Sequence, residues 1–226
     1  MNHSDKPKSR NLIPPKNNPP KRLGKTLLII LGIAIATIAG VFFTKNQKPP
    51  ENDQFSTKSD IRALGPDTAP VTITEYADFG CITCKAWHQF GIMQQVREKY
   101  SDQVRFIWRD FPVITSDSPK AAEAGFCAHD QGRFWEYHDV LYENAPKLSV
   151  ADLEKYAAQI GLDAQEFNAC LESGQHKETV DRELQDALGN GFRGTPSFVV
   201  NGEKLIGPPS FDQLSSIVDS ILGNAN

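Results

Sequence analysis

Two cysteines three positions apart are the residues whose types and spacing most directly suggest chemistry in this sequence. Cys81 and Cys84 lie in the stretch YADFGCITCKAWHQF, where a strand-like pattern gives way to a helix-like one. Two intervening residues at a helix start place both sulfurs on the first turn, near enough for a short, reducible disulfide. The pair is therefore a redox couple, a metal clamp or an inert staple, and the cellular compartment decides which of these is feasible.

The first turn of a helix favours a thiolate at Cys81, because unpaired backbone N–H groups and the helix dipole stabilise negative charge there. Cys84 is one turn further in and is expected to be more sheltered. Lowering a thiol pKa from about 8.5 to about 3.5 needs about 7 kcal/mol, whereas the dipole supplies roughly 0.3 to 2 kcal/mol. Hydrogen bonds to the sulfur from the Thr83 and Cys84 amides are expected to supply much of the rest.

A metal site is the weaker alternative for this cysteine pair. Structural zinc needs a second pair of ligands at comparable spacing, and none of the five histidines forms such a pair with a nearby cysteine. His88 follows Cys84 by four residues, where a single histidine is more often packed or solvated than ligating. The sequence therefore predicts no metal site.

An apolar run near the start of the chain predicts a membrane anchor. Residues 27–43 read LLIILGIAIATIAGVFF without a charged side chain, and a helix over 26–44 would span roughly 28 Å, close to the hydrocarbon thickness of a bilayer. Seven basic residues and one acid precede the run. This asymmetry predicts a single pass through a membrane, with a cytoplasmic N-terminus and an exported remainder. The alternative is a cleaved secretory signal, with small residues for a peptidase at Thr37 and Ala39 or at Ala34 and Ala36.

Composition divides the chain into a basic leader at 1–25, the anchor at 26–44, a polar linker at 45–60 and a domain at 61–226. The Pro/Asn-rich leader is expected to be disordered. Of the chain's 24 basic and 28 acidic residues, 17 and 27 lie beyond the leader, a net charge near −10. Such a domain repels nucleic acid and anionic lipid headgroups, so no nucleic-acid partner is expected.

The domain is predicted to begin with two parallel strands joined by a helix. Residues 71–76, VTITEY, alternate as a strand does, and a helix can run from Cys81 to about Tyr100. Residues 104–108, VRFIW, read as the second strand. A strand, a long helix and another strand suggest a right-handed parallel crossover.

A helical block is predicted from about 117 to 190. Ser118 offers an N-cap with proline at the next position, and two capping boxes are suggested by Ser149 with Asp152 and by Asp163 with Glu166.

After the block, the pattern predicts a β-hairpin and a last helix. Strands at 197–200 and 204–206 flank an Asn201-Gly202 turn. The final helix carries an apolar stripe at Leu214, Ile217, Val218 and Ile221. The expected class is therefore α/β, with the helical block inserted between the second strand and the hairpin.

Four stretches of the domain form a specific combination in this order: VTITEYADFGCITC, AGFCAHDQGRFWEYHDVLYE, FNACLESG and GTPSFVVNGEKLIG. The combination resembles the DsbA-like thiol:disulfide oxidoreductases, and the resemblance covers nearly the whole domain. It implies a thioredoxin fold with a large helical insertion between the second strand and a cis-proline loop, here preceded by the single N-terminal transmembrane helix.

The resemblance also implies roles for individual residues. Cys81 would be the nucleophile and Cys84 the resolving thiol. Glu75 matches an acidic residue beneath the disulfide that helps to move protons to or from Cys84; otherwise it is an ordinary carboxylate at a strand edge. Thr195 would pair through its backbone with an extended substrate peptide, and Pro196 would follow a cis peptide bond and face the disulfide.

Two further features follow from the same resemblance. A second, non-catalytic disulfide is expected between Cys127 and Cys170 in the helical block, two buried free thiols being the alternative. Family members usually carry proline after the first cysteine, whereas Ile82-Thr83 stands between the cysteines here. The intervening residues tune the reduction potential, so the strength of the oxidant stays open.

The expected function is a dithiol oxidase for newly exported proteins, without a dissociable organic cofactor. The resemblance implies a quinone-linked membrane partner of the DsbB or vitamin K epoxide reductase type as the reoxidant. Two alternatives stay open. One is a disulfide reductase or isomerase on the same fold, and the other is a binding module that uses the thioredoxin scaffold without needing its thiols.

Overall fold

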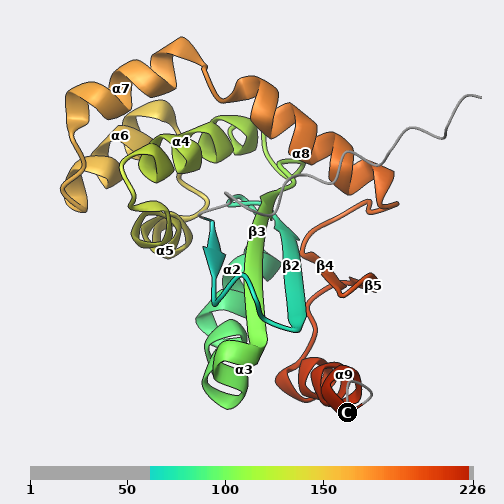
Figure 1. The fold of residues 1–226 in the computed structure, drawn as a ribbon. Helices are drawn as coiled ribbons and strands as arrows, with labels where there is room; N and C mark the ends of the chain where they lie inside the picture. Colours follow the sequence, from blue (N-terminus) through green and yellow to red (C-terminus); the bar gives the residue numbers. More distant parts are fainter. Residues whose placement is uncertain (1–61, 224–226) are drawn as a thin grey trace, which may run out of the picture. The chain divides into compact units, whose positions relative to one another are not determined.

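The computed structural model describes residues 62–223, called the described domain below. A five-stranded mixed sheet, in the order β1-β3-β2-β4-β5, forms its centre (Figure 1). The strands are β1 (Ala63–Leu64), β2 (Val71–Ala77), β3 (Val104–Asp110), β4 (Ser197–Val200) and β5 (Glu203–Ile206).

The predicted parallel crossover is confirmed. β2 and β3 run parallel from Val71↔Val104 to Ala77↔Asp110, and β4 pairs antiparallel with β2. β4 and β5 form the predicted hairpin, whose turn residues Asn201 and Gly202 take φ values of 44° and 94°. This left-handed conformation is the one that Asn-Gly turns favour. β1, which pairs antiparallel with β3, was not predicted, because two residues are too few for a period-two pattern.

Two helices, α2 (Ile82–Gln89) and α3 (Ile92–Tyr100), connect β2 to β3. The prediction of a single helix over 81–100 is therefore wrong, because this segment forms two helices. Gly91 takes a φ of 65°, a left-handed conformation that glycine adopts at little cost and that ends the helical ladder. The break confines the cysteine pair to a short helix of its own.

The helical insertion is present, with bounds close to those predicted. It comprises α4 (Ser118–Asp130), α5 (Phe134–Asn144), α6 (Val150–Gln159), α7 (Ala164–Ser173) and α8 (Lys177–Gly189). The N-cap bond of each predicted capping box forms: Ser149 Oγ accepts from the Asp152 amide at 3.3 Å, and Asp163 Oδ1 accepts from the Glu166 amide at 2.9 Å. Ser118 is not the N-cap of α4, because the helix starts one residue earlier, after Asp117.

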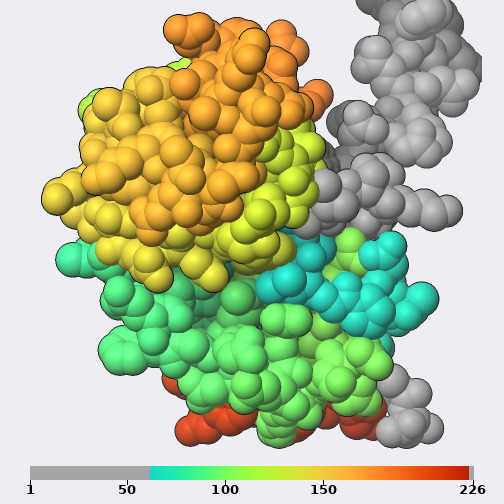
Figure 2. All heavy atoms as spheres, turned by 90° about the vertical axis from the view of Figure 1, so that its left-hand side faces the viewer, coloured from blue at the N-terminus to red at the C-terminus, as the bar shows by residue number. Residues whose placement is uncertain are grey.

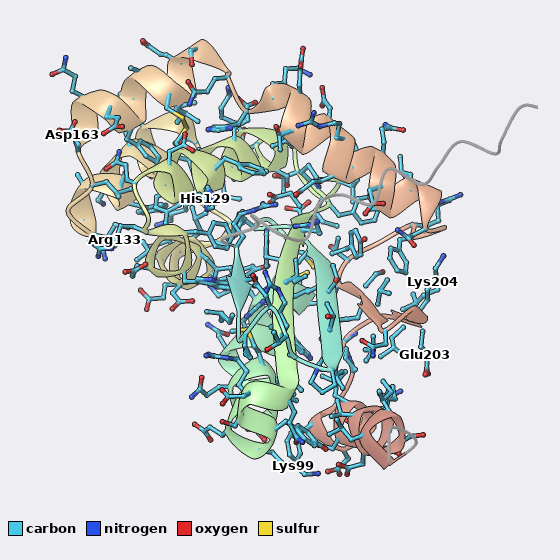
Figure 3. The ribbon with its side chains drawn as sticks, in the orientation of Figure 1. Lys99, His129, Arg133, Asp163, Glu203 and Lys204 are labelled. Carbon is cyan, nitrogen blue, oxygen red and sulfur yellow. A yellow bond between two sulfur atoms is a disulfide. The ribbon has the colours of Figure 1, made fainter. Side chains whose placement is uncertain are left out.

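The core divides between the sheet and the insertion. One apolar cluster joins one sheet face to α2, α3 and α9 (Phe211–Gly223), and a larger cluster lies mainly within α4 to α7. In Figure 2 the yellow and orange helical block lies above the green α2–α3 region. At the far end of the sheet, Lys99 Nζ lies 3.2 Å from Asp219 Oδ2 and links α3 to α9 (Figure 3).

A buried ion-pair cluster ties the sheet to the insertion. Arg62 donates to Asp110 Oδ2 on β3 at 2.6 Å and to Glu183 on α8. The Glu183 carboxylate also accepts from the Asp110 backbone amide at 2.7 Å. Because a buried charge is costly unless it is paired, these contacts fix α8 against the end of β3.

The predicted leader, anchor and linker at 1–60 lie outside the described domain. Within residues 62–223, none of the helices has the length and apolar character needed to cross a bilayer.

Candidate active site

Cys81 forms the N-cap of α2, as the sequence predicted. Its backbone is extended, with φ −84° and ψ 116°, and its sulfur accepts a hydrogen bond from the Cys84 amide at 3.2 Å. Both cysteines are free thiols in this structure and both are buried. The Cys84 amide, which has no backbone acceptor in the first helical turn, thus donates its hydrogen bond to the Cys81 sulfur.

Asp78 fixes the turn that delivers Cys81 to the helix start. Its Oδ1 accepts from the Gly80 amide at 2.7 Å, and its Oδ2 accepts from the amides of Val113 and Ile114, each at 2.7 Å. Gly80 packs so closely that a Cβ there would lie 2.9 Å from the Ser118 Oγ. The carboxylate therefore joins the cysteine loop to the segment before α4.

The two thiols are electrostatically unequal. The pKa of Cys81 is lowered to about 6, and the largest cause is a hydrogen bond from the Cys84 side chain. Burial opposes this shift, whereas the Thr195 side chain and the Cys84 and Thr83 amides add to it. Burial, the hydrogen bond to Cys81 and the charge of Glu75 raise the pKa of Cys84 far above its ordinary value. At neutral pH the reduced site therefore holds a Cys81 thiolate beside a protonated Cys84.

The Thr195-Pro196 loop lies directly against this sulfur pair. The Thr195–Pro196 peptide bond is cis, and the Thr195 carbonyl oxygen lies 3.4 Å from Cys81 Sγ. The Pro196 carbonyl accepts from the Gly207 amide at 3.0 Å, which ties the loop to the end of the hairpin. Backbone groups of Thr195 are thus held next to the sulfur that a substrate would reach.

Glu75 lies fully buried on β2, on the same strand face as Val71 and Ile73. Its Oε2 is hydrogen-bonded to His88 Nε2 on α2 at 3.0 Å. Its other oxygen, Oε1, has no hydrogen-bond partner among the described residues. The structure therefore pairs Glu75 with His88, which the sequence interpretation had taken as packed or solvated, and the charge of Glu75 acts on Cys84.

Side chains of α5 close the site from the insertion. The Tyr142 ring stacks on His88 at 4.9 Å, and its hydroxyl donates to the Asp78 carbonyl at 3.4 Å. The His138 ring meets His88 edge-on at 4.6 Å. Sequence reasoning missed Asp78, His88 and Tyr142 as site residues. Of these three residues, only His88 could have been found from the sequence, because it follows Cys84 by one helical turn.

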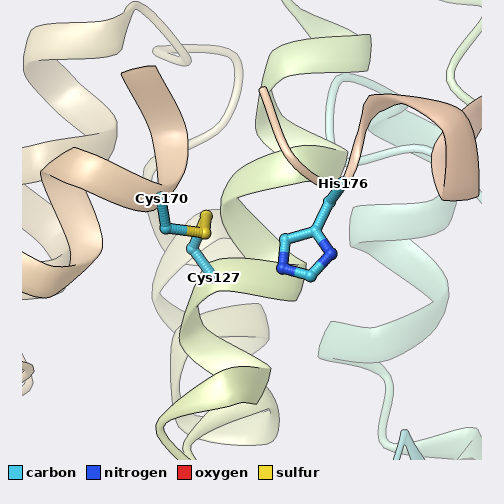
Figure 4. Close-up of side chains that lie close together, drawn as sticks. All are labelled: Cys127, Cys170 and His176. Atoms are coloured by element: carbon cyan, nitrogen blue, oxygen red, sulfur yellow. A yellow bond between two sulfur atoms is a disulfide. The ribbon is translucent and has the colours of Figure 1, made fainter. Parts of the chain in front are cut away.

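The second cysteine pair lies apart from this site. A disulfide joins Cys127 on α4 to Cys170 on α7, the pairing that the resemblance implied. His176 lies beside it (Figure 4), and these three residues are a group in the described domain with ligand atoms close enough for a metal ion. Because the two sulfurs are bonded to each other, they are not available as thiolate ligands.

Comparison with known proteins agrees with this geometry. The family model described as Thioredoxin matches residues 56–220. The chain is 30% identical over 222 residues to the probable disulfide bond formation protein D of Bacillus cereus, covering 92% of this chain and 99% of that protein. It is also 36% identical over 165 residues to the Na(+)/H(+) antiporter NhaA 3 of Salinispora tropica. That match covers 71% of this chain and 24% of the antiporter, so the chain spans about a quarter of such relatives.

Among solved structures, a thioredoxin-like oxidoreductase from Silicibacter pomeroyi matches with a TM-score of 0.65 and 27% identity, over 71% of this chain and 91% of that one. The chain belongs to the DsbA-like thiol:disulfide oxidoreductase family, with a thioredoxin-like α/β fold that carries a helical insertion.

Proposed function

We propose that this protein is an extracytoplasmic dithiol oxidase that introduces disulfides into exported proteins through Cys81 and Cys84. The observation that carries the proposal is the inequality of the two thiols. A substrate thiolate attacks Cys81 Sγ, and the electron pair of the Cys81–Cys84 bond goes to Cys84 Sγ. A second substrate thiolate then attacks the substrate sulfur of the mixed disulfide and releases Cys81 as a thiolate.

The low pKa of Cys81 favours this direction, because stabilising the thiolate stabilises the reduced form and so makes the disulfide more oxidising. Lowering that pKa from 9.0 to about 6 stabilises the reduced form at pH 7 by about 1.4 kcal/mol, which is about 30 mV for a two-electron couple. The name of the Bacillus cereus relative, a disulfide bond formation protein, supports the same direction.

The surface beside Cys81 suits an unfolded substrate. The Ile82 side chain is 81% exposed, and with Gly80, Lys85 and Pro146 it lines a hollow of about 250 Å³. The Thr195 backbone, whose carbonyl oxygen lies 3.4 Å from Cys81 Sγ, offers hydrogen bonds to an extended peptide. Together they recognise main chain and apolar side chains, which every unfolded protein presents.

An exported location is part of this proposal. A disulfide between Cys127 and Cys170 suits an oxidising compartment, and the apolar run at 27–43 behind a basic leader suits an anchor with the domain outside the cytoplasm. An anchor would keep the domain in the plane of a membrane reoxidant. We propose a quinone-linked partner of the DsbB or vitamin K epoxide reductase type.

The proposal is tested by equilibrating the full-length chain with glutathione redox buffers at pH 7 and measuring the fraction of Cys81–Cys84 disulfide. An oxidase should have a potential above about −200 mV and should oxidise a reduced dithiol peptide stoichiometrically. A potential at or below about −250 mV would instead assign the chain to the reductases.

The non-enzymatic alternative is tested by complementation in a strain that lacks its periplasmic oxidase. The wild-type chain should restore disulfide formation and the Cys81→Ala variant should not. Equal complementation by both chains would support a binding module that does not need its thiols.

A further inference from the structure

We propose that His88 and Glu75 form one proton-exchange pair that gives a proton to Cys84 when its sulfur leaves the disulfide and takes it back when Cys84 must attack. This inference rests on the proposed function, and it assigns to His88 a role that the family resemblance did not provide.

The first observation is that Glu75 obtains its polar partner from α2 rather than from the sheet. The residues in register with Glu75 are Trp108 on β3 and Phe198 on β4, and neither is charged. Its hydrogen bond to His88 Nε2 therefore has to offset the cost of burying the carboxyl group. One proton shared between the two groups keeps the pair neutral, which is the form that a buried site favours.

The second observation is that His88 lies on the helix of Cys84 and is the more exposed member of the pair. It follows Cys84 by one helical turn, so the two side chains share one face of α2. Its side chain is 8% exposed, whereas Glu75 is fully buried. Tyr142 and His138 of α5 hold its ring from the insertion side. His88 is thus the member of the pair that can exchange a proton with solvent.

Of the other titratable groups around the pair, His138 and Tyr142 have pKa values far from neutral pH, and Asp78 and Asp139 are engaged in other hydrogen bonds. Burial, together with the charge of His88, lowers the pKa of His138 to about 4. Burial, helped by the charges of Cys84 and Glu75, raises the pKa of Tyr142 well above its ordinary value. Asp78 is committed to three backbone amides, and the exposed Asp139 is bound to His138 Nδ1 at 2.8 Å. Exchange is therefore left to Cys84, Glu75 and His88.

The pair can then account for the proton in both substrate oxidation and reoxidation of the site. During substrate oxidation, the Cys84 sulfur receives the bond's electron pair and one proton from the pair, which regains a proton from solvent through His88. During reoxidation, Cys81 first forms a mixed disulfide with the oxidant. The pair then takes the proton of Cys84, the Cys84 thiolate attacks Cys81 Sγ, and the oxidant's sulfur leaves as a thiolate.

The experiment separates these two steps. Reduced full-length protein is mixed with excess oxidised glutathione between pH 5.5 and 8.5, quenched in acid, and the glutathione adduct is followed by intact mass. The first rate constant reports attack by Cys81, and the second reports closure by Cys84. The variants are His88→Gln, Glu75→Gln and the double variant. The matched control is His129→Gln, since His129 lies on α4 in the insertion (Figure 3).

We expect His88→Gln and Glu75→Gln to slow closure by about tenfold or more at pH 7, to change its pH profile, and to leave the first step within about twofold. The double variant should match the slower single variant, and His129→Gln should match wild type. The inference is overturned if His88→Gln or Glu75→Gln slows closure by less than about tenfold. It is also overturned if a variant slows the first and second steps by the same factor. Should His88→Gln fail to fold, the same criteria apply to His88→Asn. Absence of any adduct with the wild-type chain would instead refute the proposed function.

Discussion

The two cysteine pairs of the described domain differ in what surrounds each sulfur. Cys81 and Cys84 are one helical turn apart, at a helix start where the Cys84 amide donates to the Cys81 sulfur and the charge of the buried Glu75 acts on Cys84. Cys127 and Cys170 are 43 positions apart and join two helices within an apolar core. The first environment stabilises a charged sulfur, and the second restricts the chain. Spacing and surroundings, rather than the presence of two cysteines, assign the two roles.

Removing Cys81 should have the largest effect on the difference between the two cysteine pairs. Cys81→Ala should lower the rate of dithiol peptide oxidation by about 10³-fold or more, because Cys84 is too buried and too weakly acidic to replace it. Cys84→Ala should instead accumulate a mixed disulfide when it is mixed with the oxidised peptide, because the Cys81 thiolate attacks the peptide disulfide and no Cys84 thiol is present to release it; non-reducing electrophoresis would show the adduct. Comparable oxidation by Cys81→Ala and wild type would remove Cys81 from the mechanism.

Removing the other pair should affect folding rather than redox chemistry. The Cys127→Ala/Cys170→Ala variant opens a loop of about 44 residues, which is worth roughly 4 kcal/mol in the chain-entropy model. Denaturant unfolding should show a loss of that order, while the folded fraction should keep its reduction potential. A large shift in potential without a loss of stability would reverse the two assigned roles.

The Asp78 loop should link stability and redox chemistry. Asp78→Ala leaves the amides of Gly80, Val113 and Ile114 without their carboxylate and should cost about 3 kcal/mol of unfolding free energy. It should also slow Cys81 alkylation, because the turn before α2 loosens. Asp78→Asn keeps one acceptor oxygen and should lose less in both measurements. A loss confined to Asp78→Ala, with Asp78→Asn like wild type, would mean that the side chain's volume, not its acceptors, is what matters.

A helix cap in the insertion should give the smallest effect. Ser149→Ala removes the side-chain cap of α6 and should cost about 1 kcal/mol in unfolding free energy, without changing the potential. Ser210→Ala, which removes an acceptor for the Gln213 amide at the start of α9, is the matched control. A redox change in the Ser149 variant alone would show that the insertion tunes the cysteine pair.

Local patterns predicted most elements and the residues near the cysteines, because strand alternation, caps and an Asn-Gly turn act over a few positions. The break at Gly91 escaped prediction, since a single glycine within a helical pattern does not by itself end a helix. The Glu75–His88 contact escaped because it joins a strand to a helix across 13 positions. The Asp78 contacts to Val113 and Ile114 bridge an even larger separation, which no local pattern encodes.

The state of the Cys81 sulfur is most directly tested by its alkylation rate as a function of pH. In the reduced full-length chain, the rate at Cys81, mapped by peptide mass, should rise with pH through a midpoint near 6 and level off before pH 8, because the thiolate forms above its pKa. The Cys84→Ala variant should move the midpoint upward, since the Cys84 hydrogen bond is the largest cause of the shift. A wild-type midpoint at about 8.5, the value of an ordinary thiol, would contradict the account.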